Sequence, residues 1–110
     1  MGQECESRVC AYLEGLGMRV LKRNFRVPCG ELDVVALSAD GLLCVVEVKS
    51  MSRKWDDGEI EAMVGPAKRH RIKSAALLLI DGGIDVKYKG VRFDVACVGR
   101  DEIKYYEGAF

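Results

Sequence analysis

Charged side chains interrupt two of the most apolar stretches of the chain, and this pattern constrains its fold more than any other feature. Residues 30–36 read GELDVVA, with Glu31 two positions before Asp33, and residues 45–49 read VVEVK, with Glu47 two positions before Lys49. On a β-strand this spacing points both side chains to one face, with Cα atoms roughly 6.6 Å apart. A charge among core residues needs a partner, a metal ion or a shifted pKa. Three carboxylates and one lysine are therefore predicted to converge across a hairpin, as a metal-dependent phosphodiesterase requires.

The length and composition of the chain are typical of one globular domain, which we expect to span residues 1–110. Apolar residues make up 49% of the chain and charged residues 31%, as in ordinary globular proteins. No apolar run approaches the roughly 18 residues that a membrane-spanning helix needs. The first residues lack the basic start and apolar stretch of a signal peptide. We therefore expect a cytoplasmic protein with no membrane partner.

The charges balance overall but are unevenly distributed along the chain. There are 17 basic and 17 acidic residues, which argues against a protein that coats nucleic acid by charge alone. Basic residues gather within residues 19–26 and 68–73, and acidic residues within 56–61. Two of the five cysteines, Cys44 and Cys97, lie in apolar strand candidates and are expected to be small core residues.

Apolar periodicity predicts two helices and five strands. Val9, Leu13 and Leu16 form a stripe that indicates a helix over residues 3–16. Pro66 marks the first position of a second helix, which ends at residues 81–83. Its expected buried stripe is Ile72, Ala75, Ala76 and Leu79, and its basic residues are expected to point toward solvent.

The strands complete an α/β pattern. Strands are expected over residues 18–27, 31–38, 42–50, 91–98 and 103–106, with an Asp40-Gly41 turn joining the second to the third. The order of elements is therefore αβββαββ. This order predicts an α/β protein with a mixed sheet of about five strands flanked by helices.

Asp33, Glu47 and Lys49 carry the strongest chemical hypothesis. If Asp33 and Glu47 lie on adjacent strands, their carboxylates can share a Mg²⁺ ion, which accepts oxygen ligands and keeps several waters. Lys49 can then orient a water or offset charge in the transition state of phosphodiester hydrolysis. The alternative is an ion pair between Glu47 and Lys49 or Asp33 with no catalytic role. The residue pattern leaves both interpretations open.

Other charged and aromatic residues are weaker candidates. Glu31 shares the face of Asp33 and is either a further acid of the site or a residue at the strand entrance. Glu6 either faces inward from the first helix or is a solvated glutamate. Lys68 either contacts phosphate or lies on a solvated helix face, and Trp55 is a candidate for stacking on bases. The Arg92 and Asp94 pair is interpreted as a structural ion pair.

An ordered set of short motifs runs over nearly the whole chain. It comprises Glu6 with Tyr12-Leu13 and Gly17, Arg23-Asn24 with Arg26, residues 30–36 and 46–49, Lys68 with Arg71-Ile72 and Ala75, residues 92–95, and Ala109-Phe110. In this set the chain resembles the YraN-like uncharacterised bacterial proteins. These are relatives of archaeal Holliday junction resolvases in the restriction endonuclease-like superfamily.

The resemblance implies a restriction endonuclease-like core and a catalytic set of the Asp…Glu-x-Lys type. It assigns Asp33, Glu47 and Lys49 to that set, with Glu31 and Glu6 as supporting acids. Mg²⁺ or Mn²⁺ would be held by Asp33, Glu47 and the Val48 carbonyl. Phosphate contacts would come from Lys68, Arg71 and the loop with Trp55, where Arg53 stands in for a basic residue that the family commonly has at position 51.

The resemblance also implies an activity and a partner. The expected activity is a metal-dependent DNA endonuclease, resolvase-like, acting on branched or damaged DNA. Resolvase-like relatives often work as dimers, so a homodimer is expected. The alternatives are a catalytically inactive nucleic-acid-binding accessory protein of the same fold and a purely structural domain.

Overall fold

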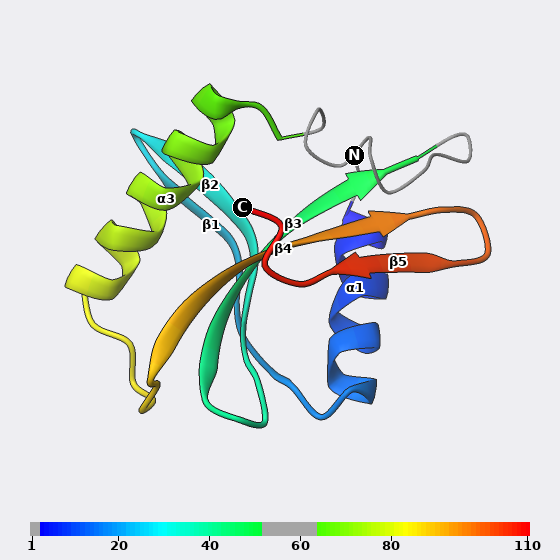
Figure 1. Cartoon of the computed structure of the whole chain (residues 1–110), viewed down its shortest axis with the longest axis horizontal. Helices are drawn as coiled ribbons and strands as arrows, with labels where there is room; N and C mark the ends of the chain where they lie inside the picture. Colours follow the sequence, from blue (N-terminus) through cyan, green and yellow to red (C-terminus); the bar gives the residue numbers. More distant parts are fainter. Residues whose placement is uncertain (1–2, 52–63) are drawn as a thin grey trace.

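Five strands form one mixed sheet with a helix packed against each face (Figure 1). The computed structural model describes residues 3–51 and 64–110. Within these residues the order of elements is αβββαββ, as predicted, and it fits a restriction endonuclease-like core. The elements are α1 (Gln3–Gly15), β1 (Arg19–Val27), β2 (Gly30–Leu37), β3 (Leu42–Ser50), α3 (Pro66–Asp81), β4 (Gly90–Val98) and β5 (Ile103–Tyr106).

The strands lie side by side in chain order, β1-β2-β3-β4-β5. β3 and β4 are parallel, and the other three neighbouring pairs are antiparallel. A parallel pair needs a long crossover connection, and the chain between β3 and β4 contains α3. Neither helix in the described residues is long and apolar enough to cross a membrane.

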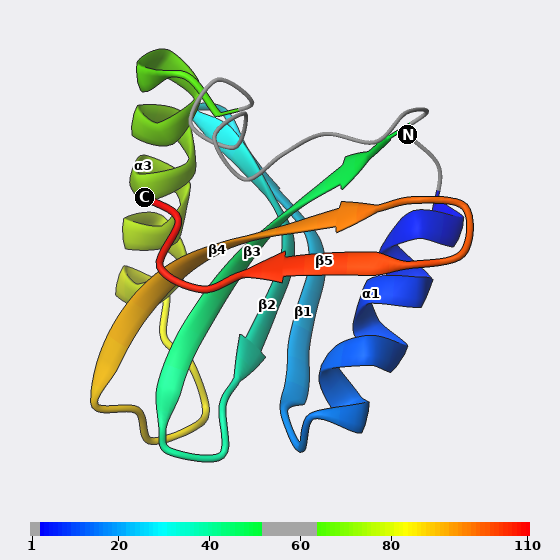
Figure 2. The ribbon, with the colours of Figure 1, turned by 45° about the vertical axis from the view of Figure 1, so that its right-hand side comes forward.

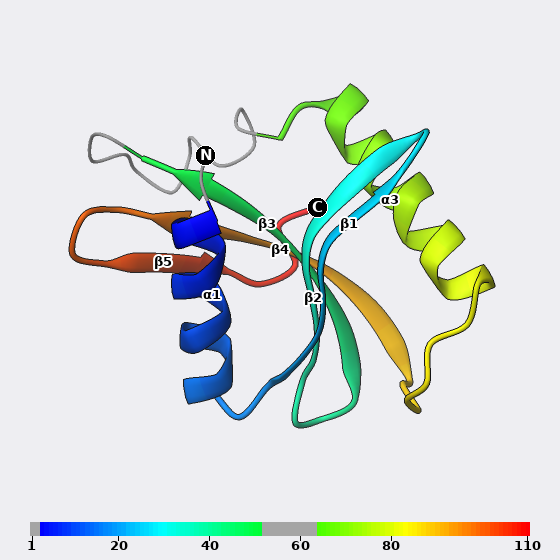
Figure 3. The same cartoon turned by 180° about the vertical axis from the view of Figure 1, so that it is seen from behind.

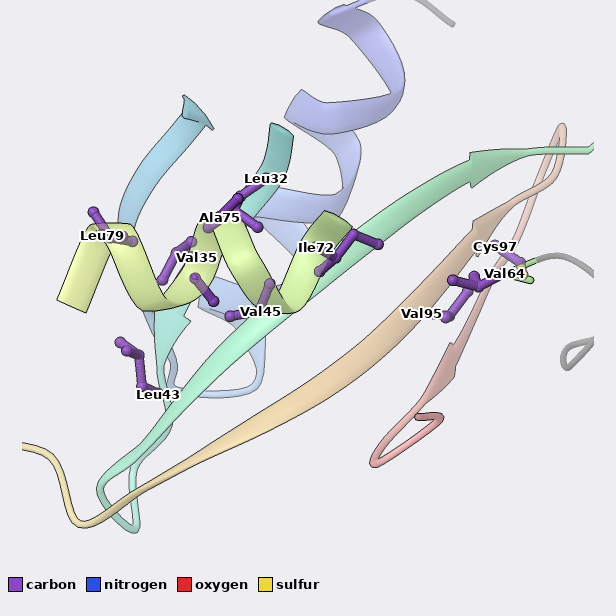
Figure 4. Packing of buried hydrophobic residues seen from close by; sticks show 11 residues of the cluster. Leu32, Val35, Leu43, Val45, Val64, Ile72, Ala75, Leu79, Val95 and Cys97 are labelled. Atoms are coloured by element: carbon purple, nitrogen blue, oxygen red, sulfur yellow. The ribbon is translucent and has the colours of Figure 1, made fainter. Parts of the chain in front are cut away.

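Alternating side chains divide the core into two apolar clusters, one on each face of the sheet. Val35, Leu43 and Val45 belong to the cluster beneath α3, which Figure 4 shows from close by. Val34 and Val46 belong to the cluster beneath α1, which lies on the opposite face of the sheet (Figure 3). The predicted stripe of α3 is buried at all four positions, namely Ile72, Ala75, Ala76 and Leu79.

The predicted stripe of α1 is correct at Val9 and Leu13 but wrong at Leu16. Leu16 is 53% exposed, because the helix ends at Gly15 and the chain turns at Gly17 with a φ of 85°. The amide of Met18 donates to the carbonyl oxygen of Leu13 across this turn, as in a Schellman-type helix end. The buried face of α1 therefore runs through Glu6 and Cys10 instead.

Arg92 and Asp94 form the structural ion pair that the sequence favoured. Arg92 donates to both carboxylate oxygens of Asp94, at 2.9 and 3.1 Å. The Tyr105 hydroxyl and the Gly108 amide also donate to this carboxylate, which is fully buried. Four donors thus compensate the burial of one charge and join β4 to β5 and to the end of the chain.

β3 separates from β2 halfway along its length. The β2–β3 ladder pairs residues 34–37 with residues 43–46, whereas β3 pairs with β4 over the whole of Leu42–Ser50. In Figure 2 the tip of the β1–β2 hairpin leans toward α3, while the end of β3 continues beside β4 and β5. The last pair of the β2–β3 ladder is Val34 with Val46. Asp33 and Glu47 are the first residues beyond it, so their side chains lie where the sheet opens.

Glycine at position 30 lets the hairpin tip touch α3. A Cβ atom at Gly30 would stand 2.5 Å from the backbone oxygen of Arg71, which is closer than real Cβ contacts come. The first residue of β2 therefore packs directly on the α3 backbone. This contact sets the position of the first turns of α3 beside the opening in the sheet.

Candidate functional site

Asp33 and Glu47 meet at the point where β2 and β3 separate. Both carboxylates are buried, with residue exposures of 7% and 4%, and their side chains are hydrogen-bonded to each other. The amide of Val48 donates to Oδ2 of Asp33 at 2.9 Å. Both main-chain groups of a strand residue point to the same side, so the Val48 carbonyl also faces β2 and the opening.

The two carboxyl groups titrate differently because their surroundings differ. Burial, the hydrogen bond with Glu47 and the Glu47 charge raise the pKa of Asp33 to about 8. Burial opposes ionisation of Glu47 as well, but its hydrogen bonds with Asp33 and Lys68 outweigh burial and lower its pKa. Near neutral pH the pair therefore holds one proton, carried by Asp33, and one negative charge on Glu47.

Two lysines face the ionised carboxylate. Nζ of Lys68 lies 2.5 Å from Oε2 of Glu47, and Nζ of Lys49 lies 3.7 Å from the same oxygen. Burial lowers the pKa of Lys49, and the neighbouring Lys68 lowers it further. Burial acts the same way on Lys68, but its hydrogen bond to Glu47 and the Glu47 charge oppose burial, and the pKa of Lys68 is raised. The cluster thus contains two ammonium groups around one carboxylate.

Lys68 does not lie on a solvated helix face, which was one of the two interpretations from sequence. It stands in the first turn of α3, and strand alternation places Glu47 on the α3 side of the sheet, next to Val45. The sequence could not show this pairing, because it depends on how the crossover helix docks. Arg71, one turn later, is exposed at the edge of the same cleft.

The two supporting acids occupy different environments. Glu6 is buried, with 5% exposure, and its Oε1 has no hydrogen-bond partner among the described residues. It shares a cavity of about 400 Å³ with Asp33, whose pKa its charge raises slightly. Glu31 is exposed and pairs with Arg26 at 3.6 Å.

Asn24 received no role from the sequence, yet it lines the same small cavity. Its φ is 53°, in the left-handed region that asparagine tolerates better than most residues. It stands between Arg23 and Phe25, whose partners on β2 are Val34 and Leu32, so it lies opposite Asp33. The sequence signals for this position were an asparagine within a basic strand and its place in the Arg23-Asn24 motif.

The acids and lysines line a cleft of about 810 Å³ with a basic rim. The rim includes the exposed side chains of Arg26 and Arg71, and Lys49 and Lys68 lie inside it. Arg53 and Trp55, two predicted nucleic-acid contacts, lie outside the described residues. The described lining of this cleft consists of residues 26–31, Asp33, residues 47–50, Lys68, Arg71 and Ile72.

The donor set of this cleft suits a hard divalent cation. Burial and the neighbouring Glu47 carboxylate raise the pKa of Asp33, and a cation can take the place of the proton that this favours. Among the described residues no third acid, histidine or cysteine completes the pair into a larger ligand cluster. Mg²⁺ is commonly held by one or two carboxylates with waters filling its other positions, so the residues fit the ion.

The fold and this cleft define an α/β protein with a restriction endonuclease-like core and buried acids where its central strands separate. The chain belongs to the uncharacterised protein family UPF0102, whose model matches residues 5–98. The family expected from the sequence is thereby confirmed.

Curated UPF0102 proteins are similar to this chain over nearly its whole length. A UPF0102 protein of Dechloromonas aromatica is 36% identical over 109 residues, covering 99% of this chain and 87% of the relative. One of Persephonella marina is 34% identical over 109 residues, covering 99% and 91%. One of Thermodesulfovibrio yellowstonii is 32% identical over 110 residues, covering 100% and 95%.

Proposed function

We propose that this protein is a Mg²⁺- or Mn²⁺-dependent DNA endonuclease that hydrolyses phosphodiester bonds, resolvase-like, in branched or damaged DNA. The observation that carries the proposal is the meeting of Asp33, Glu47 and Lys49 in a cleft with a basic rim. Asp33, Glu47 and the Val48 carbonyl would hold the ion. When bound, the ion supplies Lewis acidity for phosphoryl and water oxygens.

The chain's own residues then have separate tasks. Lys49, half-buried beside Glu47, orients the attacking water through Nζ and offsets the charge that develops on the phosphoryl oxygens. The water oxygen bonds to phosphorus while the bond to the leaving sugar oxygen breaks, and the proton that the water loses passes through solvent and is replaced by one gained on that sugar oxygen. Arg26 and Arg71 on the rim hold flanking phosphates. Glu6 and Glu31 support the site from the adjoining cavity.

A gel assay tests this function directly. Purified protein is incubated with labelled four-way junction, flap, single-stranded or duplex DNA, with Mg²⁺, Mn²⁺ or EDTA. We expect metal-dependent cleavage of a branched substrate that disappears in Asp33→Ala and Lys49→Ala. Lys22→Ala is the matched control, because Lys22 is exposed on β1 and lies outside the described cleft lining. Failure of the wild-type protein to cut any substrate would contradict the proposal.

A non-catalytic nucleic-acid-binding protein is the second candidate. One observation favours it: Glu47 is already paired with Lys68 and hydrogen-bonded to Asp33, so its charge is compensated without an ion. This candidate predicts salt-sensitive DNA binding that survives Asp33→Ala. The gel assay separates the two, because bound but uncut DNA in wild type and Asp33→Ala supports the binding protein.

A homodimer is part of the proposal, since one chain is too small to engage both sides of a junction. Leu77 and Leu78 on the outer part of α3 are 66% and 47% exposed, which leaves apolar surface for such contact. Light scattering at high protein concentration, with and without junction DNA, measures it. A uniform monomer under both conditions would contradict the dimer and leave the catalytic proposal standing.

A further inference from the structure

Lys68 holds the oxygen atom of Glu47 that a divalent cation would need. Its Nζ lies 2.5 Å from Oε2 of Glu47, closer than Lys49 at 3.7 Å. Glu47 is 4% exposed, so solvent hardly reaches this oxygen and the two lysines compensate its charge. The ammonium group therefore stands where positive charge is required, and a second cation at the same oxygen would meet it at close range.

The Lys68 side chain also has room to move away from Glu47. Its side chain is 40% exposed, compared with 27% for Lys49. It stands in the first turn of α3 and lines the cleft, whose rim includes Arg71 one turn further along the helix. A long, flexible lysine side chain can leave Glu47 without any movement of the backbone.

We propose that Lys68 is a built-in counter-ion that a divalent cation displaces from Glu47. In the metal-free protein Lys68 neutralises the buried carboxylate and so opposes metal binding. When the cation binds Asp33 and Glu47, like-charge repulsion drives the ammonium group into the cleft. There it joins Arg71 at the rim, where phosphates are expected to bind. This inference rests on the proposed function, and it adds competition between the protein's own cation and the metal ion.

Titration of the full chain with Mn²⁺, followed by calorimetry in the absence of DNA, tests the competition. We expect Lys68→Met to bind Mn²⁺ about tenfold more tightly than wild type, a difference of about 1.4 kcal/mol. Lys68→Arg keeps the charge and should bind like wild type. Lys22→Met removes one charge at an exposed position of β1 and should also leave the Mn²⁺ affinity unchanged. Glu47→Gln should lose the site.

The outcomes separate this inference from the proposed function. If wild type binds Mn²⁺, Glu47→Gln does not, and Lys68→Met binds no more tightly than wild type, the counter-ion role is overturned and the metal site stands. If neither wild type nor Lys68→Met binds, both are overturned. Mn²⁺ binding that appears only in Lys68→Met supports the inference. Thermal unfolding of each variant with EDTA shows that the proteins compared are folded.

Discussion

The backbone amide of Val48 donates a hydrogen bond to the carboxylate of Asp33, 2.9 Å away. The bond takes the place of a ladder hydrogen bond just beyond the last β2–β3 pair, Val34 with Val46. It fixes Asp33 against the backbone of the strand that carries Glu47 and Lys49. The geometry of the acidic pair is therefore held by the main chain as well as by side-chain packing.

The first prediction concerns the pH dependence of stability in EDTA. The pKa of Asp33 is about 8 in the folded protein against a usual 3.8, so between these values the folded state binds more protons than the unfolded state. The contribution of Asp33 to the free energy of unfolding is therefore present at low pH and lost as pH rises through about 8. Asp33→Asn, which does not titrate, should gain stability relative to wild type from pH 5 to 8.5.

Urea unfolding at several pH values measures this difference. We expect it to grow with pH by an amount on the order of a few kcal/mol. Asp85→Asn, at an exposed position, is the control and should follow wild type. Parallel pH profiles for wild type and Asp33→Asn would show that Asp33 is ionised throughout.

The second prediction concerns the contact between the hairpin tip and α3. Gly30→Ala would place Cβ 2.5 Å from the Arg71 backbone oxygen, so the helix has to shift. We expect a loss of about 1–3 kcal/mol in the free energy of unfolding. Gly15→Ala is the matched control, because no atom lies within 4 Å of its added Cβ. Equal stability of the two variants, measured by urea unfolding, would refute the close contact.

The third prediction concerns the buried carboxylate of Asp94. Asp94→Ala removes the acceptor shared by Arg92, Tyr105 and the Gly108 amide. We expect a loss of about 3–5 kcal/mol, because the partly buried guanidinium keeps only the exposed Glu107 carboxylate at 3.5 Å, and the Tyr105 hydroxyl and the Gly108 amide lose their acceptor. Asp94→Asn keeps one acceptor oxygen and should cost less. Asp101→Ala, at an exposed site, should change stability by less than about 0.5 kcal/mol.

The fourth prediction concerns cysteine reactivity in the native protein. Burial raises the pKa of Cys44 and of Cys97 to about 11, and burial also raises the pKa of Cys10. These thiols should resist iodoacetamide at pH 8, where the partly exposed Cys5 and Cys29 react. Intact-mass measurement should show two additions before unfolding and five after it. Alkylation of Cys44 in the folded state would contradict the packing of this core.

The elements and the central acids were predictable because they depend on local periodicity. The two-residue spacing around Asp33 and Glu47 fixed which strand face each occupies, and the structure brings the two side chains together with Lys49. The observed ends of the strands differ from the predicted ends by at most one residue, as at Gly30, which begins β2. Whether these residues catalyse hydrolysis stays a prediction.

Other features of the cleft depend on how distant elements dock, which periodicity does not report. Lys68 reaches Glu47 because Gly30 lets α3 pack closely on the hairpin tip. Glu6 is buried because it lies on the same face of α1 as Val9 and Leu13, whereas the helix ends before Leu16. The left-handed conformation of Asn24 arises within β1, which also contains a register shift between Val20 and Lys22.

The unequal pairing of β3 has a mechanical consequence. β3 pairs with β4 over nine positions but with β2 over only four. The sheet therefore consists of two parts, β1–β2 and β3–β5, that are joined by a short ladder. Asp33 belongs to the first part and Glu47 to the second. Any group that both carboxylates bind at once connects the two parts where the β2–β3 ladder ends. Binding at the cleft should therefore also make the sheet more rigid.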